Sequence, residues 1–107
     1  MVNEQQIETA YQDVIRNTER VLDSGLALEI DKENLERKVL DATFEGQIQG
    51  KNEGERKSVA MRLFQQDYAG VDAKELDYKL NSKYLSLARL RLDMLRDIIR
   101  IEELAKK

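Results

Sequence analysis

The last third of the chain, from Asp72 to Lys107, reads DAKELDYKLNSKYLSLARLRLDMLRDIIRIEELAKK and carries its strongest structural signal. Leucine, isoleucine and methionine recur there at steps of three and four residues, and neither glycine nor proline interrupts them. This spacing predicts one uninterrupted amphipathic helix over residues 72–106. Such a helix would be roughly 50 Å long, whereas a compact chain of this size has a radius of gyration of about 13 Å. We therefore expect either an elongated molecule or a helix that another chain covers in part.

The predicted helix carries its apolar side chains in two seams, each of which repeats every seven residues. The 80–104 seam consists of Leu80, Leu87, Leu90, Met94, Ile101 and Leu104, with Leu76 before it. The 85–99 seam consists of Leu85, Ala88, Leu92, Leu95, Ile98 and Ile99. A single apolar stripe is enough to pair a helix with one neighbour, so two seams indicate neighbours on two sides.

Two arrangements would satisfy both seams. Either the rest of the chain clasps the helix from both sides, or one seam meets a second copy or another protein. Helix length favours the second arrangement, because companions of roughly 14 to 20 residues would leave part of a helix of about 50 Å uncovered. The residues that we predict to bind a protein partner, or a second copy in a homo-oligomer, are Leu85, Leu92, Leu95, Ile98 and Ile99.

Helix start and stop signals divide the preceding sequence into three shorter helices. Residues that favour N-caps occur at Asn3, Asp31, Asn52 and Asp72. Glycines that favour helix ends occur at Gly25, at Gly46 or Gly50, and at Gly70. These signals predict helices over residues 4–23, 32–46 and 53–69, ahead of the one at 72–106. The expected fold is all-α, an elongated, coiled-coil-like arrangement of four helices in a single domain, residues 1–107.

The composition limits the chemistry that the chain can perform. Its 107 residues include no histidine, no cysteine and no proline, and 36% are charged. Without histidine or cysteine, the chain lacks the side chains best suited to proton transfer near neutral pH, to thiolate nucleophiles and to common metal sites. We expect a protein that is not an enzyme and that needs no cofactor. The many charges among residues 89–100 exclude a membrane span, so a soluble, cytoplasmic protein is expected.

Two groups of basic residues are candidates for binding an anion or a nucleic-acid backbone. The first group is Lys51, Arg56 and Lys57, at the predicted start of the third helix. The second group is Arg89, Arg96 and Arg100, on the last helix. Acidic residues stand close to both groups, and such mixed charges are typical of an ordinary solvated helix surface. Nucleic-acid binding is therefore an alternative to protein binding and not the favoured prediction.

The segment Gly50–Lys57 reads GKNEGERK and precedes the leucine- and arginine-rich last helix. In this respect residues 46–100 resemble a group of small all-helical proteins of phages and prophages, in which a similar GKNxxxRK segment precedes a long amphipathic helix. The resemblance implies an accessory protein encoded near phage recombination or replication genes, in the cytoplasm of the host cell. It assigns no catalytic residue.

These observations together predict a non-enzymatic protein of phage or prophage origin that acts by protein–protein interaction or assembly. The long last helix is expected to associate with itself or to bind a protein partner. One alternative is a nucleic-acid-binding accessory factor of recombination or replication that uses the basic residues of that helix. Another alternative is an inhibitor that binds a host nuclease or defence enzyme.

Overall fold

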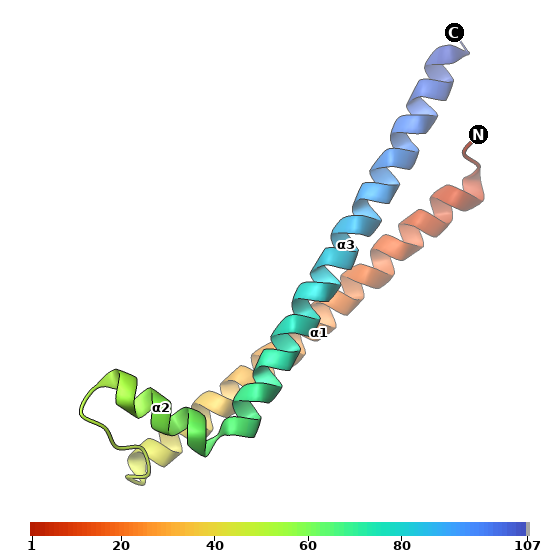
Figure 1. The fold of residues 1–107 in the computed structure, drawn as a ribbon. Helices are drawn as coiled ribbons and strands as arrows, with labels where there is room; N and C mark the ends of the chain where they lie inside the picture. The colour runs from red at the N-terminus through yellow and green to blue at the C-terminus, as the bar shows by residue number, and fades with distance from the viewer. Residues whose placement is uncertain (107) are drawn as a thin grey trace. The chain divides into compact units, whose positions relative to one another are not determined.

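The computed structural model describes residues 1–106 and contains three helices within them, as Figure 1 shows. Helix α1 spans Glu4–Phe44, α2 spans Glu53–Leu63 and α3 spans Gln65–Ala105. The prediction of an all-α fold with one long C-terminal helix is confirmed. The prediction of four helices is wrong, because the structure forms three, and two of their boundaries differ from the expected ones.

The first difference is that the helices predicted at 4–23 and 32–46 are one continuous helix, α1. Ser24 and Gly25 lie inside α1, where the Ser24 hydroxyl donates hydrogen bonds to the carbonyl oxygens of Arg20 at 2.7 Å and Val21 at 3.2 Å. The hydroxyl is thus satisfied inside the helix and does not cap a new one. Ser24 is itself buried, so a small residue fits this position on the packed face.

Helix α1 ends just before Gly46, one of the two glycines at which the sequence predicted an end, and Gly46 has a positive φ of 77°. The Gly46 amide donates to the carbonyl oxygen of Thr43 at 3.1 Å, and the Gln47 amide donates to that of Ala42 at 2.9 Å. This pair of bonds is the Schellman arrangement, which needs a residue that tolerates the left-handed conformation. Glycine at 46 therefore ends the helix where glycine at 25 does not.

The second difference lies between α2 and α3. The third helix was expected to run to residue 69 and the last to begin at 72, but α2 ends at Leu63 and α3 begins at Gln65. A single residue, Phe64, separates them, and its amide still donates to the carbonyl oxygen of Ala60 at 2.9 Å. Gly70, which was expected to end a helix, lies inside α3.

Two predicted helix starts are confirmed by their side-chain hydrogen bonds. The Asn3 side chain accepts from the Gln6 amide at 2.8 Å, and the Gln6 side chain accepts from the Asn3 amide at 2.9 Å. The Asn52 side chain accepts from the Glu55 amide at 2.9 Å, which caps α2. The sequence spacing of cap and partner therefore located these two starts correctly.

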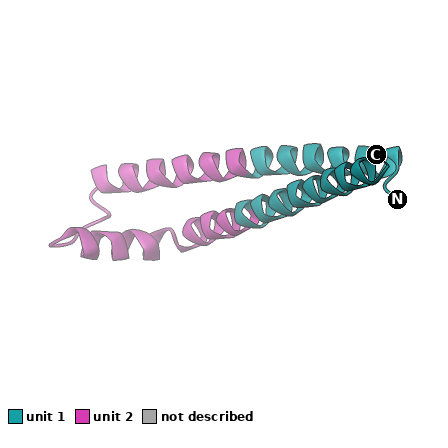
Figure 2. Cartoon of the chain, turned by 90° about the horizontal axis from the view of Figure 1, so that it is seen from above, with its two compact units in different colours: residues 1–24, 78–107 teal, residues 25–77 magenta. Residues whose placement is uncertain are grey.

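The contacts of the chain divide it into two compact units, which Figure 2 distinguishes by colour. Unit 1 consists of residues 1–24 and 78–107, and its two helical segments belong to α1 and α3. Unit 2 consists of residues 25–77 and includes all of α2. The core of unit 2 includes a cluster of three buried residues, Ala42, Ile48 and Ala60, with Val39, Val59 and Phe64 packed against it. Because this division rests on contacts within the chain alone, the single domain stays a prediction.

Candidate protein-interaction surface

The 85–99 seam is largely buried within unit 1. Leu85, Ala88 and Leu92 are buried, and Leu95 and Ile99 are half-buried. Residues 4–24 of α1 supply the opposing face, where Ala10 is buried and Val14 is half-buried. This seam is therefore the one through which the two helical segments of unit 1 hold together.

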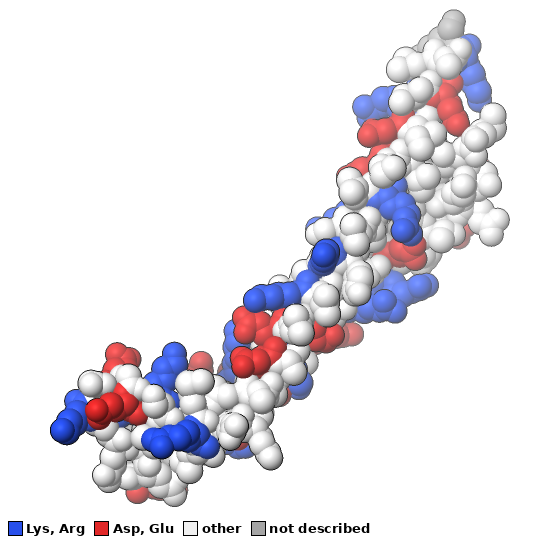
Figure 3. Space-filling view, in the orientation of Figure 1, with Lys and Arg blue, Asp and Glu red and all other residues white. Residues whose placement is uncertain are grey.

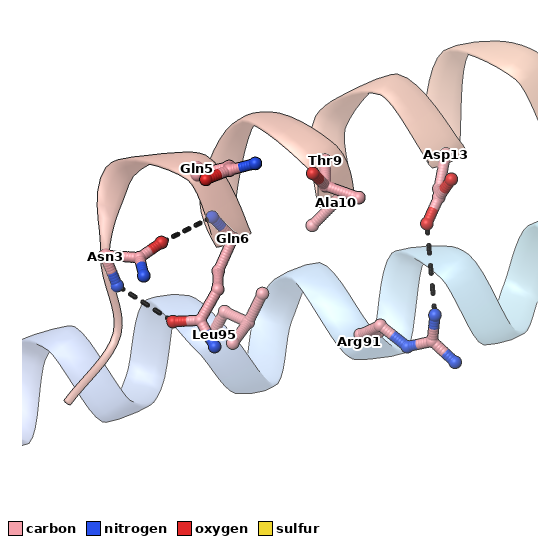
Figure 4. Close-up of a pocket in the computed structure, with 8 residues that line it drawn as sticks. All are labelled: Asn3, Gln5, Gln6, Thr9, Ala10, Asp13, Arg91 and Leu95. Carbon is pink, nitrogen blue, oxygen red and sulfur yellow. Dashed lines mark hydrogen bonds and ion pairs between the residues drawn. The ribbon is translucent and has the colours of Figure 1, made fainter.

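Figure 4 shows one side of this helix contact. Leu95 of α3 and Ala10 of α1 line a shallow pocket whose other walls are mainly polar side chains of residues 3–13. Asp13 reaches across to Arg91 of α3, with 3.9 Å between the carboxylate oxygen and the guanidinium nitrogen. The pocket is thus an open groove between two packed helices, bordered by a long ion pair, and its residues serve the packing of unit 1.

The predicted partner-binding residues fall mostly on this packed side. Leu85 and Leu92 are already covered inside the chain, Leu95 and Ile99 are half-covered, and only Ile98 counts as exposed, at 40%. A partner could reach Leu85 and Leu92 only by displacing residues 1–24. The apolar surface of α3 that the structure leaves open lies on the opposite side of the helix.

That open surface is the 80–104 seam. Seven-residue steps return to nearly the same side of a helix, so these residues share one face, roughly opposite Leu85 and Leu92. Their exposed fractions are 43% for Leu80, 51% for Leu87, 57% for Leu90, 57% for Met94, 65% for Ile101 and 63% for Leu104. Six large apolar side chains in one row, none of them buried by the chain, form the candidate interaction surface.

Two charged residues, Lys83 and Asp97, interrupt this row. They continue its spacing, because Lys83 lies between Leu80 and Leu87, and Asp97 lies between Met94 and Ile101. Both are exposed. The sequence analysis treated the seam as purely apolar and did not assign these two residues to it, although each lies seven residues from Leu90.

Helix α1 also exposes apolar side chains in unit 1. Tyr11 is 41% exposed, Ile15 is 50% exposed and Leu22 is 67% exposed. These residues follow one another at helical spacing on a face of α1 beside the packed one. The sequence analysis did not identify this surface, because only the structure shows that the packed face of α1 is the one with Ala10 and Val14.

The basic candidates lie in both units. In unit 2, the Glu55 carboxylate accepts from the Lys51 amide at 2.7 Å, and Arg56 donates to the carbonyl oxygen of Gly50 at 3.2 Å. Lys57 is exposed nearby. The start of α2, with its free amides, thus already holds a carboxylate of its own chain, which disfavours a bound anion there.

In unit 1, Arg89, Arg96 and Arg100 share one side of α3, and Asp93 stands among them. The Arg96 guanidinium lies over the ring of Tyr11, 5.2 Å from its centroid, and donates a hydrogen bond to the Tyr11 hydroxyl. This hydrogen bond raises the pKa of Arg96, so the side chain stays charged at any working pH. Arg96 is therefore engaged within unit 1, while Arg89 and Arg100 project as exposed cations.

Within residues 1–106, no cluster of three or more acidic side chains is arranged so that it could hold a metal ion. None of the three described helices contains an apolar stretch of the length that crossing a membrane requires. Comparison with known proteins gives no match, whether to a family model, to a curated protein or to a solved structure.

Proposed function

We propose that this chain is a non-enzymatic protein-interaction or assembly protein that binds its partner through the 80–104 seam of α3. The observation that carries the proposal is the row of six large apolar side chains, 43–65% exposed, on the side of α3 opposite the packed 85–99 seam. Single exposed apolar residues are common on soluble proteins, but several large ones on one helix face are typical of a binding surface.

The size of the surface supports a protein as the ligand. From Leu80 to Leu104 a helix rises about 36 Å, and a contact about 10 Å wide along it has a footprint of a few hundred Å². Covering about 300 Å² of apolar surface is worth roughly 7 kcal/mol before the costs of association are subtracted. A long, narrow apolar strip of this kind fits another helix better than a small molecule, which binds in a concave pocket.

The charged surroundings of the strip agree with a helical partner. Figure 3 shows charged groups of both signs interspersed with uncharged atoms over the visible face of the chain. Neither sign forms a large continuous area on that face, so long-range attraction to a polyanion receives little support there. Mixed charge beside an apolar row is what helix–helix interfaces use to select a partner and its orientation.

A second candidate function is nucleic-acid binding through Arg89 and Arg100, which project from the same side of α3. Arg96, between them, is folded against Tyr11, and Asp93 places a negative charge in the same row. This leaves two free cations, too few for the strongly salt-dependent affinity that phosphate backbones give. The phage setting, in which the partner would be a DNA-processing enzyme or an inhibited host enzyme, is compatible with protein binding through the 80–104 seam.

The test compares two variants that change the net charge equally. L87E/M94E places two carboxylates in the seam, whereas R89E lowers the charge by the same two units at an exposed position outside it. Sedimentation velocity of each protein alone, and retention of proteins from a bacterial lysate, would be measured beside the native chain. We expect L87E/M94E to abolish the association that the native chain and R89E share. A native chain that stays monomeric and retains nothing, or equal behaviour of all three proteins, would refute the proposal.

A further inference from the structure

The two charges inside the 80–104 seam are placed symmetrically about Leu90. Lys83 lies seven residues before Leu90, and Asp97 lies seven residues after it. Neither side chain forms an ion pair or a hydrogen bond with any other residue of the chain between 1 and 106. A partner helix that covers the seam must therefore supply a negative group near Lys83 and a positive group near Asp97, because an unpaired charge in a covered apolar contact is costly.

We propose that the partner of the 80–104 seam is a second copy of this chain in antiparallel orientation, with Leu90 of both copies at the two-fold axis. Lys83 of each copy then lies beside Asp97 of the other copy, so one sequence supplies both ion pairs. This inference rests on the proposed function and names its partner. A symmetric pair of this kind is the commonest form of homo-oligomer, because one self-complementary surface closes it.

The orientation follows from the signs of the charges. In a parallel pair in register, Lys83 would face Lys83 and Asp97 would face Asp97 across the seam. Like charges brought together at an interface disfavour the pairing, whereas opposite charges select it. Turning one copy end to end exchanges positions 83 and 97 and converts both repulsive contacts into attractive ones.

Unit 2 already contains the same arrangement within one chain. Asp31 and Lys38 lie seven residues apart on α1, and Asp67 and Lys74 lie seven residues apart on α3. The segments run antiparallel, and the carboxylates and ammonium groups pair crosswise, Asp31 with Lys74 and Lys38 with Asp67, each at 2.9 Å. Charges at seven-residue positions are therefore compatible with an antiparallel helix contact in this chain, provided that opposite signs meet.

The apolar residues of the seam fit the same register. With Leu90 at the centre, residue 87 of one copy is level with residue 93 of the other, and residue 80 with residue 100. Leu87 therefore lies within the rise of one residue, about 1.5 Å, of Met94, and Leu80 lies equally close to the level of Ile101. Both members of each pair are among the exposed apolar side chains of the seam. The register that joins Lys83 to Asp97 is thus also one that places apolar groups against apolar groups.

The expected affinity is modest. A strip of a few hundred Å² per copy belongs to the small end of protein interfaces, so dissociation constants in the micromolar range are expected. Sedimentation velocity from about 1 to about 200 µM should therefore show the mass rising from 12.4 kDa towards twice that value.

Charge exchange tests the orientation. K83E would bring a second carboxylate beside Asp97 of the other copy, and D97K would bring a second ammonium group beside Lys83. Each variant alone should therefore weaken dimerisation by roughly tenfold or more. The double variant K83E/D97K restores both pairs with the signs reversed, and its dimerisation should return to within about threefold of the native chain. In a parallel dimer neither single variant would weaken association, because the contacts are already between like charges.

Cross-linking gives a second measurement, which reports the orientation of the two copies in the dimer. The chain has no cysteine, so K83C and D97C each introduce a single thiol. With a short bis-maleimide, a mixture of K83C and D97C should give a cross-linked dimer, whereas K83C alone should give little. The antiparallel arrangement would be overturned if K83C alone gave an efficient cross-link and the mixture of K83C and D97C gave no additional cross-linked dimer.

The two proposals fail in different ways. A native chain that is monomeric at about 200 µM, yet retains a lysate protein that L87E/M94E does not retain, would overturn self-association and leave protein binding in place. A native chain that neither dimerises nor retains a protein would overturn both. A dimer that K83E and D97K leave unchanged would overturn the proposed pairing while the seam remains the binding surface.

Discussion

The sharpest test of how α3 is rotated compares two leucines that lie two residues apart. Leu92 is 6% exposed and faces residues 1–24, whereas Leu90 is 57% exposed on the opposite side. Truncating a buried leucine to alanine costs about 2 to 5 kcal/mol, and the lower half of this range applies where the surroundings can collapse. A contact between two helices can relax in this way, so we expect L92A to cost about 2 to 3 kcal/mol. L90A should change the free energy of unfolding by less than about 0.5 kcal/mol.

These free energies correspond to separate melting temperatures. For a chain of about 100 residues, each kcal/mol shifts the midpoint by roughly 4 to 8 °C, so L92A should melt some 10 to 20 °C below the native chain and L90A close to it. Far-UV circular dichroism at about 1 µM, below the expected dimerisation range, would measure both. Equal destabilisation by the two substitutions, or a larger effect of L90A, would show that the wrong face of α3 has been assigned to the interior.

Three further predictions concern the helix ends and the cross-helix ion pairs. G46A should lower the free energy of unfolding by about 1 to 2 kcal/mol, because residue 46 has a positive φ, whereas G70A should raise it by about 0.5 to 1 kcal/mol, because nothing lies within 4 Å of an added Cβ inside α3. Urea unfolding of both variants should show these opposite changes in stability. N52A should cost about 1 kcal/mol through the lost cap of α2, seen as faster amide hydrogen exchange in residues 53–56, and unchanged exchange there would contradict the capping role. A double-mutant cycle on Asp31 and Lys74, both partly exposed, should give a coupling of up to about 1 kcal/mol that falls in high salt, and a coupling independent of salt would argue against an ion pair.

The sequence predicted the all-α class and the C-terminal helix because apolar periodicity over many residues is a strong signal. It failed at Ser24 and Gly25 because capping signals are local. A cap is worth about 1 kcal/mol and a glycine inside a helix costs about the same, whereas burying one leucine contributes more than either. Val21, Leu28 and Leu35 repeat every seven residues through the supposed break without a change of phase. That repeat was the signal that could have identified α1 as continuous.

The choice between the two seams of α3 could not be made from the sequence. Both have the same seven-residue period and similar apolar content, so either could have faced the chain's own helices. The decision depends on the matching face of α1, where Ala10 and Ser24 are small enough for close approach. A candidate partner surface can therefore be identified only once the structure shows which apolar face stays exposed after the helices of the chain have packed together.

Pairing two helices covers only one face of each, so an apolar face of α3 stays exposed after the chain has packed its own helices. In unit 1 the 85–99 seam packs against residues 1–24, whereas Leu87, Leu90 and Met94 stay more than half exposed. If a second copy covers them, the long helix is flanked on both sides, once within the chain and once between copies. The two neighbours that the sequence predicted would then both be helices of this protein. The two contacts should respond differently to dilution, because dilution opens only the contact between copies while the contact within unit 1 stays closed. Loss of helicity on dilution to about 1 µM would mean instead that folding itself depends on the dimer.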